Sequence, residues 1–130
     1  MSREYTINKT LATKDIYLEV IKMAKFETTL FGEFDDILEK IQKGILGSSV
    51  SATLEDSSDF CEENSRCSVR VFERYSTFGG NRVSMTVVLF QNNGAIKISA
   101  ITAGGSQAVF MKVNTFGEEA FLKKLKEIVC

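Results

Sequence analysis

The sequence predicts an α+β domain in which two main helices pack on one face of a single antiparallel sheet of about five or six strands. Several successive segments alternate apolar and polar residues with the period of two that is typical of strands, and short turn signals separate them. One segment after the first strand and another at the carboxyl end repeat apolar residues every three or four positions, as amphipathic helices do. The predicted order is therefore strand, helix, several strands, helix, which places both helices on one face.

The first strand and the first helix are predicted to be direct neighbours in the chain. Residues 25–31 alternate in polarity and are followed by Gly32, which suits a strand and its end. Apolar residues then recur at helical spacing, and Gly47 is the expected stop. The residues of this apolar stripe are Phe34, Ile37, Leu38, Ile41 and Ile45.

The remaining strands are expected where alternation resumes. The acidic residues 55–63 are expected to form a solvated hairpin loop, and Asn93-Gly94 predicts a tight hairpin. Residues 115–118 match a capping box and are expected to begin the last helix. The expected strands are residues 50–54, 67–74, 83–90, 96–101 and, as the last strand, 108–113.

The composition excludes several classes of function. The chain has 130 residues, the size of one domain, with a net charge of −1 and no histidine, proline or tryptophan. Without histidine there is no Ser-His-Asp or Cys-His nucleophile and no His-ligated zinc. We therefore expect no catalytic residues, no metal and no cofactor. An enzyme is the least favoured class, since carboxylates, arginines, Tyr75 or a cysteine would have to do all the chemistry.

The cysteines and the amino terminus indicate the cellular compartment of the protein. Cys61, Cys67 and Cys130 are odd in number and are expected to be free thiols in a reducing cytoplasm, with a Cys61–Cys67 redox pair as the alternative. No apolar run has the length of a signal peptide or a membrane helix, so we expect no membrane partner. Residues 1–22 are expected to be an extension, either a loosely docked helix or a segment without a role in the fold, before a domain at 23–130.

The face of the sheet away from the helices is the candidate functional surface. If Val50, Val69, Val87 and Ile98 point toward the helices, the opposite face combines arginines, hydroxyls and large apolar groups. Three interpretations stay open: a solvated face, an interface for a homodimer or another partner, and a platform for a small anionic ligand or a single nucleic-acid strand, which the net charge disfavours. The candidate residues are Arg70, Phe72, Arg74, Arg82, Val88, Phe90 and Ile101.

These observations favour a non-enzymatic binding or self-association module that uses the open sheet face. The alternative is a small-ligand pocket between sheet and helices, walled by Phe34, Phe110 and Phe116. Ser106 and Gln107, which follow a pair of glycines, would lie at its rim.

Four segments carry a resemblance to a known family. They are SSVSATLED (48–56), RCSVRVFERY (66–75), GGNRVS (79–84) and AITAGGSQA (100–108). They resemble a small bacterial family defined only as a domain of unknown function, and the likeness covers Met23 to Cys130. The resemblance implies a bacterial, cytoplasmic protein and no particular activity. By element order the chain is also similar to TATA-binding-protein-like and helix-grip folds, a likeness of architecture that assigns no function.

Overall fold

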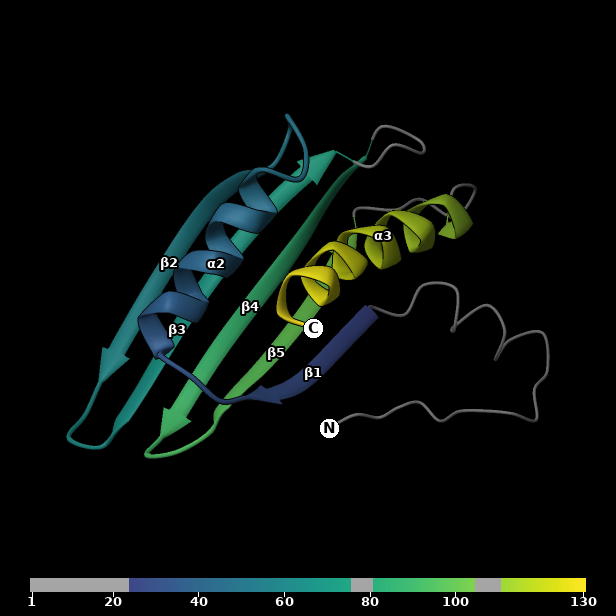
Figure 1. The fold of residues 1–130 in the computed structure, drawn as a ribbon. Coiled ribbons are helices and arrows are strands. Elements are labelled where there is room, and N and C mark those ends of the chain that lie inside the picture. Colours follow the sequence, from purple (N-terminus) through teal and green to yellow (C-terminus); the bar gives the residue numbers. More distant parts are fainter. Residues whose placement is uncertain (1–23, 76–80, 105–110) are drawn as a thin grey trace, which may run out of the picture.

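The computed structural model describes residues 24–75, 81–104 and 111–130, and Figure 1 shows how they are arranged. The order strand, helix, four strands, helix agrees with the sequence prediction. The elements are β1 (Ala24–Leu30), α2 (Phe34–Leu46), β2 (Thr53–Cys61), β3 (Ser65–Tyr75), β4 (Arg82–Asn92), β5 (Ile96–Gly104) and α3 (Met111–Val129).

The strands form one five-stranded sheet in the order β1-β5-β4-β3-β2, and every neighbouring pair is antiparallel. Both helices lie in front of the same face of this sheet in Figure 1, α2 over β2 and β3, and α3 over β4 and β5. The predicted α+β class with both helices on one face is confirmed. In the described part of the chain, no helix or strand covers the other face, which we call the open face.

Helix α2 forms because its apolar residues share one side. Four of them are buried: Phe34, Leu38, Ile41 and Ile45. Acidic residues occupy its first turn and a lysine its last, as the helix dipole favours. Gly47 ends the helix as predicted, and its N–H donates to the carbonyl of Lys43 at 2.9 Å.

The core lies between the two helices and the middle of the sheet. On β4, the inward-facing residues are those predicted from the alternation, and all four are fully buried: Val83, Met85, Val87 and Leu89. Helix α3 contributes Phe121, Leu122 and Leu125 from above. The helices approach each other closely at Gly44, where an added Cβ would lie only 2.5 Å from the Cδ1 of Ile128.

Two predictions of secondary structure are wrong. Of the acidic residues that we expected in a loop, Glu55, Asp56 and Asp59 lie within β2, which begins at Thr53 and is exposed along its whole length, and only Glu62 and Glu63 lie in the turn to β3. As an edge strand, β2 needs no apolar face, because its backbone pairs with β3. The expected last strand at 108–113 is also wrong, since α3 begins at Met111. Helix α3 therefore starts before the capping box, and residues 108–110 lie outside the described part of the chain.

Candidate functional site: the open face of the sheet

The strand register determines which side chains share the open face. Directly paired residues of an antiparallel sheet project to the same side, and each strand alternates between the two sides. Val69 pairs with Val88, which pairs with Ser99, and Ser99 pairs with Glu27. Since Val83, Met85, Val87 and Leu89 point into the core, this row belongs to the open face.

Three of the predicted site residues lie on the other side of the sheet. Arg70, Phe72 and Arg74 alternate with the valines of β3 and point under the helices, where Phe72 is fully buried and Arg70 is 8% exposed. Our expectation that Val69 faces the helices and the arginines face solvent is therefore wrong. Val50, which we also expected to face inward, lies before β2 and is fully exposed.

Arg70 is held by acceptors from three elements. Its Nε donates to the Oε1 of Gln42 on α2 at 2.7 Å, and its Nη1 donates to the Oδ1 of Asp59 on β2 at 3.1 Å. The carbonyl of Val69 accepts a third hydrogen bond at 2.9 Å. The Ser68 hydroxyl donates to the same Asp59 oxygen at 2.6 Å, and this bond, followed by the Arg70 guanidinium, lowers the pKa of Asp59 below its usual value. Arg70 thus joins α2 to the edge of the sheet.

Arg74 lies further along the same strand and stacks on a core ring. Its guanidinium is 4.6 Å from the centre of the Phe121 ring, a cation–π contact between β3 and α3. Burial lowers the pKa of Arg74, and no carboxylate of the described residues forms an ion pair with it. Both arginines therefore contact the helices, away from the open face.

The other four predicted residues, Arg82, Val88, Phe90 and Ile101, do lie on the open face. Val88 and Phe90 belong to a continuous group of apolar side chains that the register places on neighbouring strands. Three of its members are well exposed for their size, Phe60 by 64%, Ile101 by 41% and Phe90 by 40%. We call this group the apolar band: Phe60, Cys67, Val69, Val71, Val88, Phe90 and Ile101.

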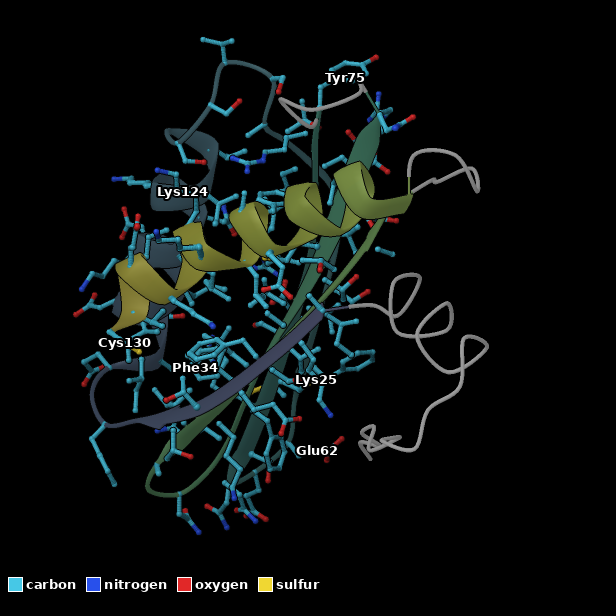
Figure 2. All side chains as sticks on the ribbon, turned by 90° about the vertical axis from the view of Figure 1, so that its right-hand side faces the viewer. Lys25, Phe34, Glu62, Tyr75, Lys124 and Cys130 are labelled. Atoms are coloured by element: carbon cyan, nitrogen blue, oxygen red, sulfur yellow. The ribbon has the colours of Figure 1, made fainter. Side chains whose placement is uncertain are left out.

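Charged groups of both signs border the apolar band. Arg82 forms ion pairs with Glu73 and, at 3.5 Å, with Glu55, and its guanidinium lies over the Tyr75 ring. At the other edge, Lys25 lies 3.9 Å from Glu27. Figure 2 views the sheet from the β1 edge, where Lys25 lies on the side of the sheet opposite to Lys124 of α3. Arg82 and Lys25 thus have carboxylate neighbours, whereas Lys97 on the same face forms no ion pair with the described residues.

The open face has a hollow on each side of β4. The first lies over β4, β5 and β1, and Phe90, Lys97 and Ser99 are among the residues that line it. The second lies toward the opposite edge strand, β2, and is lined in part by Phe60, Cys67 and Phe90. Phe90 therefore borders both hollows.

Residues 23–130 match the model of a protein family described as a family of unknown function, DUF6054. The chain belongs to DUF6054. No curated protein matches it. Membership of DUF6054 agrees with the resemblance noted in the sequence and assigns no activity to the chain.

The remaining predicted features of this DUF6054 chain have mixed outcomes. Cys61 and Cys67 lie on opposite faces, because Cys61 pairs with Arg66 on the helix side while Cys67 pairs with Phe60, so the alternative of a redox pair is wrong. Among the described residues, no group of Cys, Asp and Glu side chains could hold a metal ion, and neither helix is long and apolar enough to cross a membrane. The expected pocket rim, Ser106 and Gln107, lies outside the described residues.

The sequence missed four members of the apolar band. The alternation in β3, which has apolar residues in both phases, predicts Cys67, Val69 and Val71 in the core, and the acidic stretch predicts Phe60 in a loop. The other phase of the alternation in β3 is the signal that could have revealed them. That phase places Phe72 in the core and Val69 and Val71 on the opposite face.

Proposed function

We propose that this protein is a non-enzymatic self-association module whose open sheet face binds a second copy of the same chain. The observation that supports it is the apolar band, which lies mainly on β3 and β4 and is left uncovered by α2 and α3. Aromatic and aliphatic side chains that are clustered and exposed in this way are typical of interface centres, and a polar rim surrounds them here as at known interfaces.

The open face is large enough for a stable dimer. Five strands spaced about 4.8 Å apart, with about nine residues each at about 3.3 Å per residue, span roughly 24 by 30 Å. The resulting area of roughly 700 Å² per partner is close to the roughly 800 Å² of a standard protein interface.

The charges favour a second copy over a polyanion. A nucleic acid or an anionic ligand is held by basic groups that are free to neutralise phosphates. Here Arg82 is engaged by Glu73 and Glu55, and Lys25 lies beside Glu27. Among the described residues of this face, this leaves Lys97 as the one cation without an ion pair. A surface with balanced charges can complement itself, as the two identical patches of a twofold dimer must.

The test is the oligomeric state of the full chain, measured by sedimentation equilibrium over a wide concentration range. Wild type is expected to dimerise reversibly. Phe90→Asp places a carboxylate in the apolar band and is expected to leave a folded monomer, because an unpaired buried charge opposes association. The matched control is Val50→Asp, which introduces the same carboxylate at an exposed apolar side chain outside the sheet and is expected to dimerise like wild type.

Circular dichroism tests whether both variants are folded, as we expect. A wild-type protein that stays monomeric throughout the range contradicts the proposal, and so does a Phe90→Asp protein that dimerises as tightly as the control.

A further inference from the structure

We infer that the twofold axis of this dimer runs along β4, so that β3 of each copy lies over β5 of the other. The inference rests on the proposed function and specifies the geometry of the same surface. β4 is the middle strand of the five, so an axis along it gives the greatest overlap of the two open faces. Sheets that pack face to face keep their strands aligned to within about 30°, which leaves an axis along the strands or one across them.

The outward side chains of one cross-strand row show why the axis follows the strands. The register places Asp56, Val71, Thr86, Ile101 and Lys25 in one line from β2 to β1. Read in reverse, this row is complementary to itself, with a carboxylate against an ammonium group and an aliphatic group against an aliphatic group. An axis along β4 superposes the row on its own reverse. Each dimer then gains two Asp56–Lys25 pairs and two Val71–Ile101 contacts around a central Thr86.

An axis across the strands brings like surfaces together. It would place β2 of one copy on β2 of the other, and the charged side chains that β2 turns to the open side are carboxylates, Glu55 and Asp56. Juxtaposed like charges oppose association. Electrostatics therefore favour the axis along β4.

The test uses charge reversal in the full chain. Asp56→Lys and Lys25→Glu each replace two attractive pairs of the dimer by two repulsive ones, so each is expected to raise the Kd of its homodimer by about tenfold or more. Mixing the two variants restores both pairs, so the heterodimer is expected to form with nearly wild-type affinity. Native mass spectrometry resolves homodimers from heterodimers, and sedimentation gives the Kd.

The control is Lys124→Glu, which changes the net charge as Lys25→Glu does, but on the helix side of the molecule (Figure 2). It is expected to leave the Kd unchanged. A wild type that does not dimerise contradicts the proposed function and with it this geometry. A wild-type dimer whose Kd does not respond to the reversals, or whose weakened variants gain nothing on mixing, overturns the axis along β4 and leaves self-association standing.

Discussion

Replacing Phe72 by alanine tests the assignment of the two faces of β3. Phe72 is fully buried beneath the helices, whereas Phe90 on the open face is 40% exposed. Truncating a buried phenylalanine costs about 3–5 kcal/mol, through lost burial and the cavity left behind. A domain of this size has roughly 5–15 kcal/mol of stability, so Phe72→Ala removes a large part of it. With a urea m-value of about 1.5 kcal/mol/M, the unfolding midpoint falls by about 2–3 M.

Urea unfolding followed by far-ultraviolet circular dichroism measures this shift. Phe90→Ala is the matched control, and the same truncation there is expected to cost much less in the monomer. Association stabilises the folded state by mass action, so the two proteins are compared at low concentration and again tenfold higher. The shift for Phe72→Ala is expected at both concentrations, whereas that of Phe90→Ala should grow with concentration. If Phe72→Ala lowers the midpoint no more than Phe90→Ala at low concentration, the face assignment fails.

Two further changes probe a turn and a hydrogen-bonded acid. Gly32→Ala is expected to destabilise the fold by about 1–3 kcal/mol, because Gly32 has φ 148°, whereas Gly94→Ala, with open space around it, is expected to be nearly neutral in thermal melts. Ser68 lowers the pKa of Asp59, so the stability that this carboxylate adds is complete above its unfolded pKa of 3.8 and is lost as the pH falls through the folded value. Asp59→Asn is therefore expected to lose less stability than wild type as the pH falls through this acid range, measured by urea midpoints. Glu63→Gln at the β2–β3 turn is expected to keep the wild-type dependence of stability on pH. The same pH dependence for both variants would refute the role of Asp59.

The sequence predicted α2 and the strands β4 and β5 well, because in each the apolar residues of one side clearly outnumber those of the other. On β4, every second residue from Val83 to Leu89 is strongly apolar and faces the core. Periodicity identifies such an element and its inward side together, since only one phase buries the apolar residues. The order of the elements, and with it the α+β class, followed from these clear segments.

β3 shows where the same reasoning fails. Both of its phases contain apolar residues, with Val69 and Val71 in one and Phe72 in the other. The phase with the valines appears more apolar, yet the structure buries the phase that contains two arginines. Their long side chains reach partners that lie far away in the sequence, Gln42 for Arg70 and Phe121 for Arg74. No local pattern could reveal these contacts, because they depend on where the helices lie.

The corrected position of the arginines changes the functional interpretation of the open face. Arg70 and Arg74 favour an anionic ligand only if they lie beside Phe90 on the open face, as the sequence predicts. With Arg70 bound to Asp59 and Gln42 on the helix side, the open face loses those cations and gains Val69 and Val71. A surface with fewer free positive charges and more aliphatic area is less suited to binding phosphate and better suited to binding a protein. The position of Arg70 and Arg74 on the helix side therefore supports self-association through the apolar band that remains on the open face.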